Sequence, residues 1–162
     1  MISTSALAFE IAPIGTIEAD FAGEAIAHAT AKVTKGDRVS STAFLHLIGA
    51  FSSLSLTGLG DNNARLDISV SFQSDAPDVK MLPVDVEISY APTGKAQRWI
   101  ANETPGRDNI SFTTLTFEGD EGHVTGTFSA SLCYAESYED DADMENCRPI
   151  KGSFDSPIAI EL

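Results

Sequence analysis

The sequence predicts an all-β protein, an antiparallel β-sandwich of about eight or nine strands. Polar and apolar residues alternate with a period of two over 66–72 and 84–90, the pattern of strands with one buried face. Clusters of Gly, Asp, Asn and Pro separate such runs at short intervals. A closed β-barrel is the alternative, because the same alternation serves both architectures.

The N-terminal half supplies the first predicted strands. Residues 16–21 alternate, and a Gly23-Glu24 turn leads into 25–33. That Ala-rich stretch would also suit a short helix, but its short connections to neighbouring strands favour a strand. The apolar region 42–58 is too long for one strand, and Gly49 near its middle predicts two strands or one bent strand.

The C-terminal half supplies the remaining strands. After the 66–72 and 84–90 runs, the irregular region 91–108 contains a short strand at 97–100. Residues 110–118 change phase midway, which predicts a bulge or burial on both faces. The last two strands cover 124–133 and 150–162. Neither a fixed-period repeat nor a linker interrupts the chain, so residues 1–162 are predicted to form one domain.

Net charge narrows the range of partners. Ten Lys and Arg against 24 Asp and Glu give a formal charge of −14. Such a surface repels nucleic acid and anionic lipid, and favours solubility or attraction of cations and basic partners. No stretch reaches the roughly 18 apolar residues of a transmembrane helix.

The first 15 residues bear on location. They lack the basic segment and unbroken apolar segment of a signal peptide. The chain is therefore expected to be cytoplasmic, or to be exported with its signal already removed, in the periplasm or outside the cell.

The last two strands predict a disulfide. With Cys133 opposite Cys147, the apolar faces of both strands coincide, and Phe128 lies over Gly152. One register thus satisfies burial, side-chain size and cysteine proximity. Directly opposed strand residues are spaced as a disulfide requires, and the bond implies an oxidising compartment.

The loop 134–146 between these cysteines is the candidate metal site. It contains six carboxylates, among which Asp140, Asp141, Asp143 and Glu145 are the candidate calcium ligands. The glycine and distant bidentate Glu of an EF-hand are absent, so the loop does not match that motif. A solvated acidic loop without metal is the simpler interpretation.

Other residues suggest further chemistry. His28, His46 and His123 are scattered without metal-ligand spacing, and no nucleophile elbow is present, so a hydrolase would need a site assembled from distant residues. Trp99 could stack on a ligand if exposed, although such a ring more often plugs a core. We identify no catalytic and no organic cofactor-binding residues.

Two segments, GTIEADFAGEAIAHA and the ending GHVTGTFSASLC…NCRPIKGSFDSPI, resemble small exported bacterial β-sandwich domains of unknown function. The resemblance implies a periplasmic or lipoprotein-type module. This chain lacks the lipobox cysteine of a lipoprotein, and those families have no established catalytic residues to transfer.

Together these patterns predict a non-catalytic exported binding or structural module, with a protein or a carbohydrate as partner. The alternatives are a calcium-stabilised module and a hydrolase with a dispersed site. An exposed aromatic or apolar patch would favour the binding module, and a uniformly polar surface would count against it.

Overall fold

The computed structural model describes residues 9–101 and 109–162, and within them the protein is all-β. The strands are β1 (Phe9–Phe21), β2 (Glu24–Lys35), β3 (Arg38–Ser41), β4 (Ala43–Ile48), β5 (Phe51–Leu59), β6 (Arg65–Phe72), β7 (Asp85–Ala91), β8 (Arg98–Ala101), β9 (Ile110–Glu118), β10 (Glu121–Ala135) and β11 (Asp143–Glu161). One 3-10 turn, η1 (Asp61–Asn63), connects β5 to β6. No helix in this part of the chain is long and apolar enough to cross a membrane.

The predicted count of eight or nine strands is too low, since the described residues form eleven. The region 42–58 divides into β4 and β5 around Gly49, whose φ of 60° suits a tight turn. The four-residue strand β3 was missed because it is too short to show alternation. The Ala-rich stretch 25–33 lies within β2, as predicted, and is not a helix.

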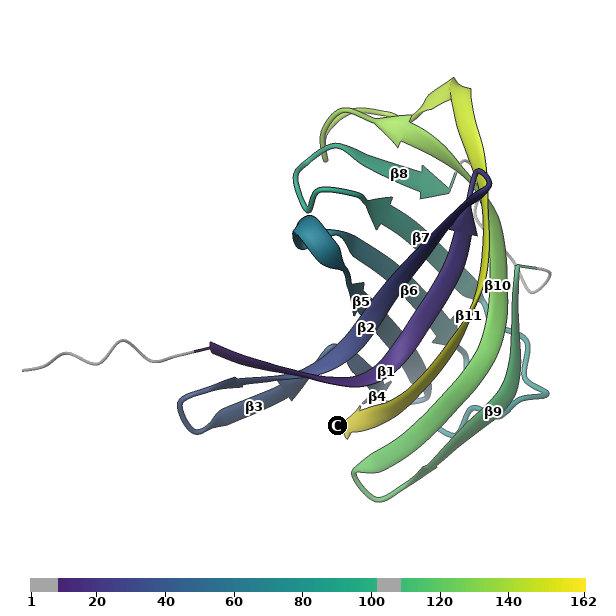
Figure 1. The fold of residues 1–162 in the computed structure, drawn as a ribbon. Helices are drawn as coiled ribbons and strands as arrows, with labels where there is room; N and C mark the ends of the chain where they lie inside the picture. The colour runs from purple at the N-terminus through teal and green to yellow at the C-terminus, as the bar shows by residue number, and fades with distance from the viewer. Residues whose placement is uncertain (1–8, 102–108) are drawn as a thin grey trace, which may run out of the picture.

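All eleven strands belong to one sheet in the order β3-β2-β1-β11-β4-β5-β6-β7-β8-β10-β9. Two further pairings, β2–β5 and β11–β10, connect strands that are distant in this order. Most neighbours are antiparallel, but β11 and β4 pair in parallel through residues 159–161 of β11. In Figure 1 the sheet curves, so that β5, β6 and β7 lie behind β1 and β11.

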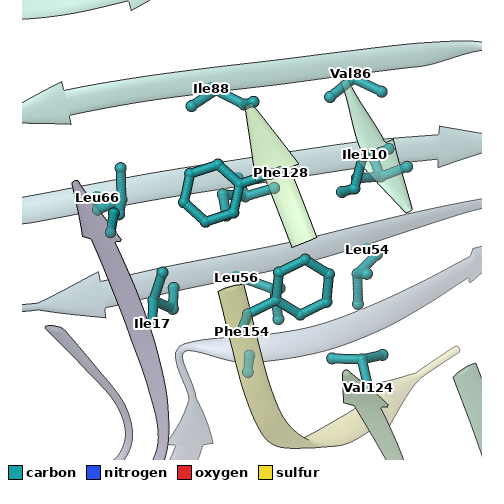
Figure 2. Packing of buried hydrophobic residues seen from close by; sticks show 14 of the residues in the cluster. Ile17, Leu54, Leu56, Leu66, Val86, Ile88, Ile110, Val124, Phe128 and Phe154 are labelled. Carbon is teal, nitrogen blue, oxygen red and sulfur yellow. The ribbon is translucent and has the colours of Figure 1, made fainter. Parts of the chain in front are cut away.

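The core lies between these parts of the sheet. The alternating side chains of β6 and β7 point into it, and Phe128 and Phe154 reach the same interior from β10 and β11 (Figure 2). Each fully buried aliphatic or aromatic side chain contributes roughly 1.5–3 kcal/mol of transfer free energy. Val84 departs from the predicted alternation: it precedes the first residue of β7 and is exposed at the end of the sheet.

The phase change in β9 is a bulge. Thr114 pairs with Thr125, but Phe112 pairs with Gly126, so one residue of β9 has no opposite partner. Ile110 and Leu115 are consequently both buried despite their odd separation. The bulge was one of two alternatives that the sequence allowed.

The loops gather at two opposite ends of the sheet. The β1–β2 turn, η1, the loop 92–97 and the loop 136–142 lie at one end, named here the acidic end. The β4–β5 turn, the loop 73–84 and the β9–β10 turn lie at the other, named the apolar end. The candidate functional groups divide between these ends.

Candidate functional site

The hairpin of β10 and β11 has the register predicted from sequence. Cys133 lies opposite Cys147, and Phe128 lies opposite Gly152. A Cβ atom on Gly152 would stand 2.8 Å from the Cβ of Ala19 on β1, so the glycine allows three strands to pack closely.

Cys133 and Cys147 form the predicted disulfide. The sequence places it on the polar face of the hairpin, yet Cys133 is fully buried and Cys147 is half-buried. Cys133 is covered because it also pairs with Ile100 of β8, on the side opposite β11. The bond is compatible with an oxidising compartment.

The loop 134–146 presents its carboxylates outward. Asp140, Asp141, Asp143 and Glu145 are all exposed. Asp143 uses Oδ1 to accept a hydrogen bond from the backbone N–H of Glu145, at 3.0 Å. Among the described residues, no three His, Cys, Asp or Glu side chains converge as metal ligands. A calcium ion would therefore require the loop to rearrange.

Two arginines sit over aromatic rings beside this loop. The Arg98 guanidinium lies 3.6 Å from the centroid of the Tyr138 ring, and the Arg148 guanidinium lies 4.9 Å from that of Trp99. Cation–π contacts of this kind hold the base of the loop and place positive charge near its carboxylates.

Trp99 occupies the place of a core plug. It is 8% exposed and packs edge-on against Phe21 and Tyr134, with centroid separations of 5.3 and 5.4 Å. With Arg148 over the ring, little of either face is free. Stacking on a sugar or peptide would require this cover to move.

His28 is the most unusual buried group. It is 5% exposed, and within residues 9–101 and 109–162 neither ring nitrogen has a hydrogen-bond partner. A Cβ atom on Gly58 would stand 2.7 Å from the Cβ of His28, and one on Gly60 would stand 2.9 Å from its Cδ2. These glycines make room for the imidazole, which also packs edge-to-face with the Tyr90 ring, the two centroids lying 5.8 Å apart.

Burial lowers the pKa of His28 below its usual value, and the nearby carboxylate of Asp61 opposes that shift only in part. The ring is therefore neutral at pH 7. Because no hydroxyl of the described residues is hydrogen-bonded to this ring, the imidazole has no nucleophile to activate as a general base.

The other two histidines lie on the outer face. His46 is half-buried opposite Ser53, whereas His123 places Nε2 2.7 Å from Oδ1 of Asp155. Both members of that pair are exposed. No hydrogen bond joins any histidine to a Ser or Thr hydroxyl within the described ranges. His123 and Asp155 thus form a base–carboxylate pair without a nucleophile.

A shallow hollow lies on the outer surface of the sheet. It has a volume of about 570 Å³ and crosses the outer faces of β1, β11, β10 and β9. Its lining includes Glu18, Asp20, Lys151 and Thr127. Asp20 lies directly opposite Lys151, so its one cation faces a carboxylate. Sequence reasoning did not find this hollow.

Exposed apolar side chains gather at the apolar end. Ile48 and Phe51 face each other across the β4–β5 turn. The adjoining loop 73–84 adds Val79, Leu82 and Val84, and these five side chains are 42 to 59% exposed. We call them the apolar cluster. Single exposed apolar residues are ordinary, but five in two connections at the same end of the sheet are a concentration of the kind that binding surfaces use.

The sequence matches no protein-family model, and neither curated proteins nor solved structures give a match. The functional argument therefore depends on the geometry of this chain.

Proposed function

We propose that this protein is a non-catalytic, exported binding module whose partner is a protein that contacts the apolar end. The observation that carries the proposal is the apolar cluster: Ile48, Phe51, Val79, Leu82 and Val84. A surface with such a patch meets the criterion that distinguishes a binding module from a uniformly polar domain.

The chemistry of the cluster favours a protein over a carbohydrate. Four of its five members are aliphatic, and Phe51 is its single ring. Sugar recognition needs flat aromatic faces beside convergent polar groups, whereas aliphatic and aromatic anchors in a small desolvated area are typical of protein interfaces. The sole tryptophan, Trp99, is buried at the acidic end.

The disulfide supports export, because it fits a chain that matures in an oxidising compartment. The surroundings of the histidines support the absence of catalysis. Among the residues that the structure describes, no hydroxyl is bonded to the His123–Asp155 pair, and His28 is neutral and enclosed. A hydrolase would need a nucleophile beside one of these rings.

The pairings support a closed barrel over the two-layered sandwich as the finer description of the fold. They run from β11 through β4, β5, β6, β7, β8 and β10 and return to β11. A sandwich would leave edges in this circuit. Slow amide exchange along both edges of β11 would support closure, and rapid exchange along one edge would contradict it.

The partner hypothesis is tested with photo-crosslinking residues. A benzophenone amino acid at position 51 or 82 should give a discrete adduct in an extract of the source cells. An excess of unlabelled wild type should compete the adduct away, whereas an excess of a Phe51→Ser, Leu82→Ser double variant should not.

Glu87 provides the control, because it is exposed on the outer face of β7 and is not part of the cluster. The same crosslinker at position 87 should give no such adduct. Adducts of equal yield at all three positions, or none at 51 and 82, would refute a specific apolar interface.

A further inference from the structure

One part of the sheet leaves the body of the protein. Residues 9–13 of β1, residues 31–35 of β2 and all of β3 form a three-stranded extension that projects sideways in Figure 1. We call this extension the arm. β1 pairs with β11 only from Thr16 onward, and β3 pairs only with β2, so within the described residues both edges of the arm lack a strand partner.

Apolar side chains are also exposed on both faces of the arm. Phe9, Ile11 and Val39 are 62, 59 and 63% exposed. Phe9 and Ile11 lie on one face, while Val39, opposite Thr34, lies on the other. A small sheet with unpaired edges and apolar residues on both faces is a template for association with another chain. Natural proteins usually cover or block strand edges that are exposed in this way.

The arm is locally basic in an acidic protein. Three of the chain's ten basic residues, Lys32, Lys35 and Arg38, fall within seven consecutive positions, and all three are exposed. The Lys35 ammonium lies 5.0 Å over the Phe9 ring. The described arm also contains Glu10 and Asp37, so its net charge is about +1 against −14 for the whole chain.

The complementary surface is the acidic end of the same protein. The loop 134–146 contains six exposed or half-exposed carboxylates, and its apolar side chains Tyr138 and Met144 are exposed as well. It therefore offers charge opposite to that of the arm, together with apolar area.

An arm cannot reach the acidic end of its own molecule. β1 runs from the arm at Phe9 to the acidic end at Phe21, a span of up to roughly 40 Å at about 3.3 Å per residue. Any contact between the arm and the acidic end must therefore join two copies of the protein. A symmetric contact of two arms would instead join two surfaces of the same net sign, each about +1, which electrostatic complementarity disfavours.

We propose that this protein self-associates head to tail, with the arm of one copy docked on the acidic end of the next. The interface is heterologous, so it builds rings or open chains rather than closed two-fold dimers. It uses a different surface from the apolar cluster and does not depend on the partner proposed there.

Charge exchange tests the pairing of the two surfaces. The arm variant carries Lys32→Glu, Lys35→Glu and Arg38→Glu. The loop variant carries Glu139→Lys, Asp140→Lys and Asp141→Lys. All six residues are exposed, so both variants should keep the wild-type melting temperature within a few degrees.

Sedimentation velocity at low ionic strength provides the readout. Wild type should show species larger than a monomer that grow with protein concentration and disappear in about 0.5 M salt. Each variant alone should associate at least tenfold more weakly. An equimolar mixture of the two should recover association, because the acidic arm of one then meets the basic loop of the other.

The β9–β10 turn supplies the matched control. Glu118→Lys, Asp120→Lys and Glu121→Lys change the net charge as the loop variant does, at exposed positions of the apolar end. This control should associate like wild type. A wild type that stays monomeric, or folded variants whose mixture does not associate, would overturn the proposal. Loss of association in the arm variant alone would overturn it in favour of arm-to-arm contact.

Discussion

Burial of His28 without a hydrogen-bond partner should make the stability of this protein depend on pH near neutrality. In the unfolded chain an imidazole binds a proton with a pKa of about 6.5. In the native protein burial lowers the pKa of His28, so the folded state binds fewer protons below that pH. Protonation then favours the unfolded state, and stability falls as pH falls.

The magnitude follows from linkage for a single proton. If His28 stays neutral in the native state, lowering the pH from 7.5 to 5.5 reduces the free energy of unfolding by up to about 1.4 kcal/mol. Above about pH 7 the contribution vanishes. Below the lowered native pKa it becomes constant, because both states are then protonated.

Replacement by phenylalanine isolates this contribution. His28→Phe keeps a flat ring between Gly58 and Gly60 and removes two buried nitrogens that have no partner. Removing unsatisfied buried polar atoms should stabilise the protein at pH 7.5 by about 1 kcal/mol, less the cost of fitting the larger ring. The variant should also lose the fall in stability between pH 7.5 and 5.5.

Urea unfolding of both proteins at several pH values in this range measures the effect. The difference between the two curves isolates the contribution of His28, because every other ionisable group is common to both proteins. Asp61→Asn is a second check, because removing that carboxylate should lower the pKa of His28 further. Parallel stability curves for wild type and His28→Phe would show that His28 has the same pKa in the native and unfolded states, and would refute the reasoning.

Three further predictions concern the acidic end and the hairpin. Replacing both Cys133 and Cys147 by Ala should lower the free energy of unfolding by about 3 kcal/mol, because the disulfide closes a loop between residues 14 positions apart. Reduction of the wild-type disulfide should cause the same loss, measured by chemical denaturation. Gly152→Ala should destabilise by more than 1 kcal/mol, because the new methyl group would overlap Ala19; an unchanged melting temperature would contradict the packing. Melting curves in millimolar calcium and in EDTA should coincide, since the carboxylates do not converge; a rise of several degrees that Asp141→Asn with Asp143→Asn abolishes would instead establish the calcium site.

Local pattern was enough to predict the strands with strict alternation and the terminal hairpin. The register of β10 and β11 followed because burial, glycine position and cysteine proximity all required the same alignment. The same register places Asp155 opposite Thr125, two residues from His123 on one face, so the His123–Asp155 pair was also within reach of the sequence.

Other features depend on long-range packing that one sequence does not display. The parallel contact of β11 with β4 and the contact of β2 with β5 join strands that show no shared signal. The confinement of His28 required knowing that Gly58 and Gly60 lie beside it. Val84 follows the alternation of β7 but lies beyond its end, so period alone assigned it to the core.

The total charge of −14 sums over surfaces of different charge, and the sum alone does not indicate which partners each surface attracts. Repulsion of polyanions follows from the sum, but a docking surface responds to the field within about 10 Å at 0.1 M salt. Over that distance the arm presents Lys32, Lys35 and Arg38, whereas the loop 134–146 presents carboxylates. A protein divided in this way attracts its own copies even though its total charge repels them, so its association should strengthen when salt is reduced. A protein with the same charge spread evenly would show the opposite dependence.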